Sequence, residues 1–308
     1  GKYISGQAHA DYIGVDRLVG LKGTSWLYTA GKQADIKYIV VDDHGNPAKG
    51  TPVAITVEHK TTKAARVKGA GNAYLTEYHE EWEAAGDCKG VSETDALTCS
   101  FTPNKTGVYR AVAKISDTKG NTHATTLNMY ATGSDYVVWD DQNDSSLTIV
   151  PESTSYKVGD TARYLVKNPY PGAKALITVE RYGVLDHFVQ TFDGSTPVVE
   201  FKIKPEYLPG FYLSVVIVSP RVEKPLGEGQ VDLGKPTFRM GYLTVPVKDP
   251  YKEMLITSKT DKDVYKPRDK VTLTLHAEPR VKDKKEPIEL TIAVLDESVF
   301  DLITGGKG

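Results

Sequence analysis

The sequence predicts an all-β protein made of tandem antiparallel β-sandwiches, and three observations support this fold class. Tyr (18 copies) is plentiful, and 27 Gly and 17 Pro punctuate the chain throughout, a composition typical of strands joined by turns. Apolar and polar residues alternate at period two, as in Val53–Val57 and Val199–Ile203, which indicates half-buried strands. A tyrosine-led turn also recurs along the chain, as repeated modules require.

The tyrosine-led turn is clearest at Tyr156–Ala162, which returns as Tyr265–Val271 and more loosely as Tyr28–Ala34. Each copy leads into a β-branched run, so we expect the tyrosine to anchor one strand while Gly, Pro or Asp reverses the chain. A second repeat relates Thr106–Val112 to Pro209–Val215. It predicts, in each of two modules, a turn that is followed by a core strand late in the module.

Two further segments concern local structure in the first module. The turn Asp43–Asn46 predicts a hairpin that joins residues 36–42 to residues 51–58. The segment Ala73–Ala85 places Tyr74, Tyr78 and Trp82 at helical spacing, but it fits an extended strand equally well. The pattern leaves these two alternatives open.

A chain of 308 residues exceeds the usual size of one core, so two or three domains are expected. We expect residues 1–15 to be the tail of a preceding domain, and residues 16–133 and 134–250 each to form a sandwich. Residues 251–308 would be the first part of a third sandwich, because about 100 residues are needed for a complete one. The chain begins at Gly1 without Met and ends at Gly308, which suggests a cut from a longer polypeptide.

The sequence offers little chemistry. Its 38 basic and 40 acidic residues give a net charge of -2 without long blocks, which argues against a nucleic-acid partner. The seven histidines show no zinc or triad spacing, and no nucleotide or hydrolase motif occurs. We therefore expect no enzyme activity, no cofactor and no metal. For the acidic cluster Asp140–Asp144, a calcium site is the alternative to the favoured solvated turn.

The two cysteines, Cys88 and Cys99, are eleven positions apart across a turn-rich stretch. We predict that they form a disulfide, the alternative being two free buried thiols in a cytosolic protein.

The end of the chain carries a family resemblance. The segment Leu290–Phe300 resembles a strand signature of the alpha-2-macroglobulin and complement superfamily. Upstream, Tyr265–Asp269 resembles the turn that opens the same module, with Arg268 in place of the usual Gly, and Pro169–Arg181 resembles the bacterial branch. The resemblance implies macroglobulin-like domains, which are sandwiches of immunoglobulin or fibronectin type. The signature residues are Val294, Leu295, Asp296, Glu297, Val299 and Phe300.

Members of this family entrap proteases after an exposed bait segment is cleaved, and a Cys-Gln thioester then bonds the attacker. The resemblance implies that this chain is a scaffold segment of a broad-spectrum bacterial protease inhibitor, with the bait region starting close to or beyond Gly308. A thioester requires Gly-Cys-x-Glu-Gln, and neither Cys88 nor Cys99 lies in that motif. No thioester is therefore expected in these residues.

The resemblance also implies partners and location. Proteases would be met by the full-length parent, neighbouring macroglobulin-like domains would pack beside this monomeric chain, and the parent would be periplasmic. Two variants of the location stay open: a lipid anchor to the inner membrane through the parent's N-terminus, and a secreted or cell-surface protein. The alternative functions are an Ig-like surface adhesin or ligand-binding array, and a carbohydrate-binding accessory to an enzyme.

Overall fold

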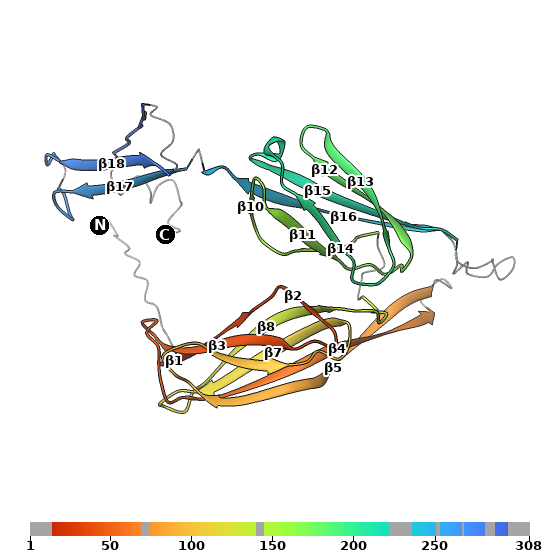
Figure 1. Cartoon of the computed structure of the whole chain (residues 1–308). Coiled ribbons are helices and arrows are strands. Elements are labelled where there is room, and N and C mark those ends of the chain that lie inside the picture. The colour runs from red at the N-terminus through yellow and green to blue at the C-terminus, as the bar shows by residue number, and fades with distance from the viewer. Residues whose placement is uncertain are drawn as a thin grey trace, which may run out of the picture. The chain divides into compact units, whose positions relative to one another are not determined.

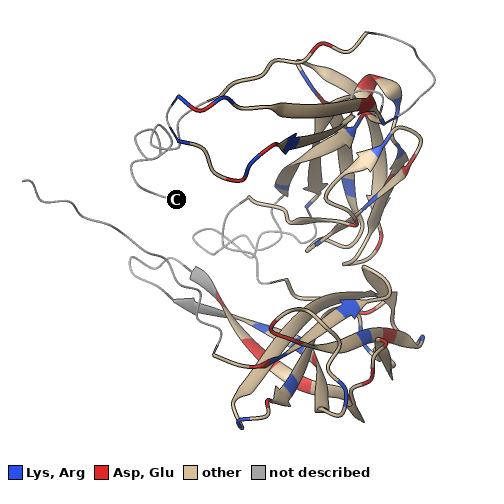
Figure 2. Ribbon diagram, turned by 90° about the vertical axis from the view of Figure 1, so that its left-hand side faces the viewer, with Lys and Arg blue, Asp and Glu red and all other residues tan. Residues whose placement is uncertain are grey.

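The computed structural model describes residues 14–68, 74–139, 145–221, 236–250, 253–266, 268–280 and 287–294. These residues form strands and connections, with one 3-10 turn, η2 (Pro205–Tyr207) (Figure 1). In this part of the chain, no helix has the length and apolar character needed to cross a membrane. Two compact units result, Gly1–Val247 and Lys248–Gly308. Basic and acidic residues are interspersed along the ribbon (Figure 2), as the balanced sequence charge predicts.

The first sandwich consists of two sheets whose apolar faces share one core. Its strands are β1 (Arg17–Gly23), β2 (Leu27–Thr29), β3 (Ala34–Asp42), β4 (Pro52–Lys68), β5 (Tyr74–Val91), β6 (Leu97–Phe101), β7 (Gly107–Ser116) and β8 (Thr122–Thr132). One sheet has the order β1-β3-β6 and the other β2-β8-β7-β4-β5. Alternate residues point inward, so Ile36 of β3 joins Ile55 of β4 and Ala111 of β7 in the core.

The second sandwich repeats this arrangement. Its strands are β9 (Ile149–Pro151), β10 (Tyr156–Lys157), β11 (Thr161–Val166), β12 (Ala173–Glu180), β13 (Val184–Phe192), β14 (Val198–Lys202), β15 (Gly210–Ser219) and β16 (Thr237–Lys248). The sheets have the orders β14-β11-β9 and β10-β16-β15-β12-β13, matching those of the first sandwich strand for strand. The all-β tandem-sandwich prediction is therefore confirmed. The pairing of β2 with β8 departs from the antiparallel prediction, because these two strands run parallel.

The tyrosine-led turn has the same geometry in its three copies. Gly31, Gly159 and Arg268 occupy the same place in the turn and have φ angles of 80°, 91° and 76°. In each copy, the residue after this position donates its backbone N–H to the carbonyl three residues before it. In the second copy, for example, the Asp160 N–H donates to the Lys157 carbonyl at 3.1 Å. Glycine favours this left-handed region, yet Arg268 adopts it as well. The replacement of the usual glycine by Arg268 therefore leaves the backbone geometry of the turn unchanged.

The predicted hairpin from residues 36–42 to 51–58 is wrong. The turn itself forms, since Val41 bridges Pro47 and the Asp42 N–H donates to the Asn46 carbonyl at 2.8 Å. After Gly50 the chain crosses to the other sheet, where β4 pairs with β5 and β7 and not with β3. Both strands show inward apolar alternation, and this pattern does not reveal which of two facing sheets a strand joins.

The segment with two open alternatives, Ala73–Ala85, is extended from Tyr74 within β5. Its register with β4 places acidic residues beside basic ones, with ion pairs between Lys60 and Glu80 and between Lys63 and Glu81. The Arg110 guanidinium lies 4.0 Å from the centre of the Trp82 ring, a cation–π contact. Cross-strand pairing thus outweighs the helical spacing.

The described part of the second compact unit contains one hairpin, β17 (Met254–Thr260) with β18 (Leu273–Pro279). All seven residues of β17 are exposed. The predicted division at residues 1–15, 16–133, 134–250 and 251–308 stays a prediction. The sheets themselves comprise residues 17–132 and 149–248 in the two sandwiches.

Candidate functional site

The disulfide is the first predicted site feature, and the structure contains it between Cys88 and Cys99. Cys88 lies on β5 opposite Ile55 of β4, and Cys99 lies on β6 opposite Ile36 of β3. The bond therefore joins the two sheets of the first sandwich across their shared core. Cys99 is buried and Cys88 partly buried. Because both sulfur atoms are part of this disulfide, neither cysteine can form a thioester while the bond is present.

The signature segment Leu290–Phe300, which resembles a strand of the family, is described only in its first five residues. Its described residues, Leu290–Val294, belong to no strand, and Val294 is 76% exposed. Leu295, Asp296, Glu297, Val299 and Phe300 lie outside the described residues. A strand becomes buried only when a facing sheet covers it, and the described part of this unit contains a single two-stranded sheet.

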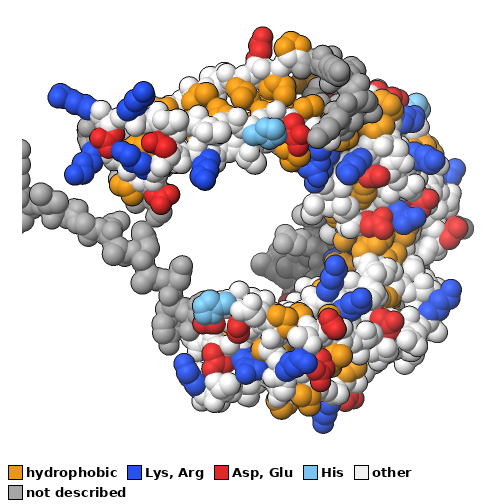
Figure 3. Space-filling model, turned by 60° about the vertical axis from the view of Figure 1, so that its left-hand side comes forward, with side chains coloured by type: hydrophobic (Ala, Val, Ile, Leu, Met, Phe, Trp, Pro, Cys, Tyr) orange, Lys and Arg blue, Asp and Glu red, His pale blue; other side chains and the backbone are white. Residues whose placement is uncertain are grey.

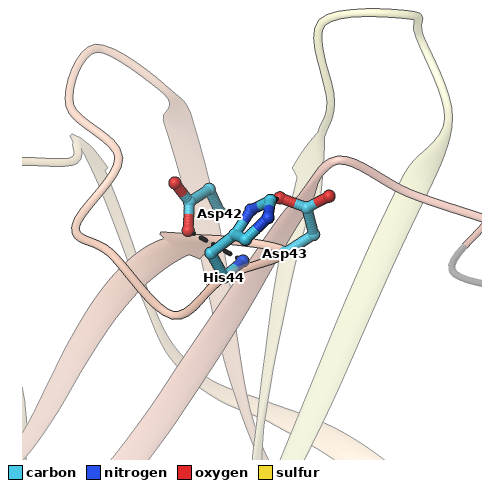
Figure 4. Close-up of side chains that lie close together, drawn as sticks. All are labelled: Asp42, Asp43 and His44. Atoms are coloured by element: carbon cyan, nitrogen blue, oxygen red, sulfur yellow. Dashed lines mark hydrogen bonds and ion pairs between the residues drawn. The ribbon is translucent and has the colours of Figure 1, made fainter.

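The acidic cluster Asp140–Asp144 also lies outside the described residues. Within them, Asp42, Asp43 and His44 bring three potential metal ligands together (Figure 4). The Asp42 carboxylate accepts the backbone N–H groups of His44 at 3.0 Å and Asn46 at 2.8 Å. The Asn46 N–H, as the largest cause, holds the pKa of the Asp42 carboxyl below its usual value.

A second copy of the Asp42 turn explains this geometry without a metal. Asp117 begins an Asp-x-x-Gly-Asn turn of the same kind, and its carboxylate accepts the N–H groups of Lys119 at 2.9 Å and Asn121 at 2.7 Å. No histidine is present in this second turn. The carboxylates therefore serve to close two turns, and the Asp42 group carries no metal assignment.

The connection between the two sandwiches, residues 133–139, is held by hydrogen bonds at both ends. The Asp135 carboxylate accepts the Thr106 N–H at 3.0 Å. Ser195, which is buried, accepts the Val137 N–H through its hydroxyl at 3.2 Å and the Trp139 indole N–H through its carbonyl at 3.0 Å. Trp139 is itself buried. The connection is thus tied to the β6–β7 loop on one side and to the β13–β14 loop on the other.

Asn168 organises the loop that presents Ser195. Its side chain is fully buried, and its amide donates to the carbonyls of Gly194 at 2.8 Å and Tyr170 at 3.1 Å. Its side-chain oxygen accepts the Tyr170 N–H at 3.0 Å, and its own N–H donates to the Ser195 carbonyl at 3.1 Å. One buried amide therefore fixes the loop that anchors the connection.

A cavity of about 360 Å³ lies beside this connection, with His59, Lys105, Asp135 and Trp139 among its walls. His59 is only 8% exposed, and its Nε2 lies 3.2 Å from the Thr106 carbonyl oxygen. A carbonyl only accepts, so in the neutral ring Nε2 carries the hydrogen. Its Nδ1 has no hydrogen-bond partner among the described residues.

Burial lowers the pKa of His59, although the Thr106 carbonyl opposes this shift. Above its ordinary value of 6.5, the ring is neutral in the folded and unfolded chain alike. As the pH falls below that value, the unfolded chain takes up a proton that the folded ring resists, so the free energy of unfolding should decrease. We expect His59→Gln to flatten this decrease, measured by urea unfolding between about pH 7 and about pH 5.

The matched control for this prediction is His187→Gln, because His187 is an exposed histidine on β13. The control should keep the pH dependence of the parent chain. Equal flattening by both substitutions would show that burial of His59 is not the cause.

Sequence reasoning did not identify Asn168, Ser195 or His59. Nothing in the pattern distinguishes Asn168 from any polar residue that ends an apolar strand. Its role depends on which carbonyls the folded loops bring to it.

Comparisons with known proteins give a consistent result. A family model described as the alpha-2-macroglobulin bait region domain matches residues 147–302. The alpha-2-macroglobulin homolog of Nostoc sp. (strain PCC 7120) is 26% identical over 296 residues, which cover 93% of this chain and 15% of that protein. The alpha-2-macroglobulin of Ralstonia nicotianae is 29% identical over 189 residues, covering 57% of this chain and 11% of that protein.

Solved structures similar to this chain include the cryo-EM structure of the native conformation of E. coli alpha-2-macroglobulin. Its TM-score is 0.35 at 15% identity, over 87% of this chain and 17% of that chain. The chain thus spans a small part of the length of each relative that it matches.

Proposed function

Because this chain belongs to the alpha-2-macroglobulin family, we propose that it is a scaffold segment of a protease inhibitor that entraps its target after bait cleavage. The observation that carries the proposal is the match of the bait region domain model over residues 147–302. The match lies upstream of Gly308, near which sequence analysis expected the bait segment to begin. Where a cleavable segment lies stays a prediction.

The disulfide supports a scaffold role for this chain and not a role in the covalent capture of a protease. Covalent capture needs an acyl donor, and the only two cysteines of these 308 residues are bonded to each other. Two sandwiches with shared topology and an anchored connection are suited to a scaffold, because backbone that is hydrogen-bonded within sheets resists local unfolding. Protease contact would then be made by the full-length parent, and we propose that the chain itself catalyses no reaction.

We also propose an extracytoplasmic, periplasmic location for the parent. The supporting feature is the Cys88–Cys99 bond, since disulfides persist mainly in oxidising compartments.

The test compares the full-length parent with this chain alone, each mixed with trypsin. Entrapment should protect a large protein substrate from cleavage, because the surrounding inhibitor keeps large molecules away from the protease. A small peptide substrate can still reach the protease and should still be cleaved. The isolated chain should protect neither substrate. Failure of the parent to protect the large substrate would overturn the inhibitor function and leave the adhesin or ligand-binding alternative. Stoichiometric inhibition by the chain alone would overturn the scaffold role.

A further inference from the structure

The outer face of the five-stranded sheet in the second sandwich is apolar where a solvated face would be polar. Along β12 the inward residues Ala175 and Ile177 are fully buried, as the alternation requires. The outward residue between them is Leu176, which is 42% exposed. Antiparallel sheets with one face in water normally show polar residues at such positions.

The sheet register aligns four apolar residues in one row across this face. Val189 of β13 lies opposite Leu176 of β12, Leu176 opposite Val216 of β15, and Val216 opposite Met240 of β16. Val189 and Met240 are exposed, and Val216 is partly buried. We call this row and its apolar neighbours the outer apolar face.

Neighbouring rows extend the outer apolar face along β15 and β16. The additional exposed residues are Tyr212, Val218, Phe238 and Tyr242. Hydrophobic side chains reach the surface between charged ones in the space-filling view (Figure 3). Contiguous apolar surface of this kind marks an interaction site in a soluble protein.

The corresponding sheet of the first sandwich provides an internal comparison. One of its outward rows reads Asp87, Thr56, Val112 and Thr126 across β5, β4, β7 and β8. Three of these four residues are polar. Since the two sandwiches share one topology, the apolar face is a property of the second sandwich and not of the fold.

Charge placement on β12 indicates what covers the face. Its outward residues run Lys174, Leu176, Thr178 and Glu180, so that a cation begins the strand and an anion ends it. Neither Lys174 nor Glu180 has an ion-pair partner among the described residues, although the Thr178 hydroxyl donates to the Glu180 carboxylate. A surface with opposite charges at its two ends is complementary to itself when one copy is reversed.

We propose that the outer apolar face is the interface of a homodimer, in which a second copy of this chain stacks face to face. With β12 antiparallel to its counterpart, Lys174 lies opposite Glu180 of the second copy, and the same pair forms again at the other end. The apolar row is then buried between the two ion pairs. Facing sheets pack about 10 Å apart, a gap that a lysine and a glutamate together can bridge.

The dimer should be weak. Four strands about 4.8 Å apart and seven residues at about 3.4 Å each give a face smaller than the roughly 800 Å² per partner of a standard interface. We therefore expect dissociation at tens of micromolar or above. The family resemblance implies a monomer, which this association would replace at high concentration.

Sedimentation equilibrium from about 1 µM to about 200 µM tests the proposal on the intact chain. Leu176→Lys should weaken dimerisation by about tenfold or more, because it places an unpaired charge in the buried row. Lys174→Glu should also weaken it, since like charges then face each other, and adding Glu180→Lys should restore it. The matched control is Lys114→Glu, at an exposed position on β7 of the first sandwich.

A carbodiimide, which joins amines directly to carboxylates, provides a second readout. In a mixture of ¹⁴N- and ¹⁵N-labelled chains, a mixed-label crosslink between Lys174 and Glu180 supports the proposed stacking. A monomer over the whole concentration range would overturn the proposal. So would a dimer that responds to Lys114→Glu as strongly as to the charge changes on β12.

Discussion

Asn168→Leu is expected to lower the free energy of unfolding of the second sandwich by about 3 kcal/mol. The replacement removes the amide from a fully buried position. Two groups, the Gly194 carbonyl and the Tyr170 N–H, then lose the only hydrogen bond that the described structure gives them. The free energy of unfolding decreases because a buried donor or acceptor without a partner retains its desolvation cost. Urea unfolding measures this change.

The same substitution should loosen the connection between the sandwiches, since Asn168 fixes the loop that carries Ser195. We expect faster chymotrypsin cleavage after Tyr136, which is 63% exposed. The matched control, Asn128→Leu, alters an exposed asparagine on β8 and should change stability by less than about 0.5 kcal/mol. If Asn168→Leu destabilises the chain without faster cleavage at Tyr136, Asn168 stabilises its own loop but does not anchor the connection.

Replacing both cysteines by alanine should destabilise the first sandwich by about 3 kcal/mol, because the closed loop no longer restricts the unfolded chain. The effect should stay within residues 17–132, where Cys88 and Cys99 join β5 to β6. Amide hydrogen exchange should accelerate in β3, β4 and β7, and should be unchanged in β12 and β15.

The control for this prediction is the unsubstituted chain after reduction, which lacks the bond but retains both side chains. It should match the double alanine variant within about 1 kcal/mol. Equal acceleration in both sandwiches would show that the two unfold as one cooperative unit. No acceleration at all would show that core packing alone sustains the first sandwich.

Local features of the fold could be predicted from the sequence because each depends on neighbouring residues. The alternation at Val53–Val57 predicted a strand, and β4 contains it. The tyrosine turns were recognised in all three copies, and their geometry is shared even where Arg268 replaces glycine. The disulfide followed from the number and spacing of the cysteines.

Features that depend on distant residues could not be predicted in this way. Alternation showed that residues 36–42 and 51–58 are strands, but not that they belong to facing sheets. Likewise, Leu176, Val189 and Met240 are unremarkable apolar residues in the sequence. Only the register of β12, β13, β15 and β16 shows that they form one row.

The sequence by itself determined the strands, their turns, the repeat and the family, because periodicity, turn chemistry and motif spacing act over a few residues. The tertiary structure decided which strands share a sheet, which side chains meet at the connection, and which face is left apolar. Those outcomes depend on pairing between segments as far apart as β12 and β16. Such pairing is set by the packing of the whole core, to which every strand contributes.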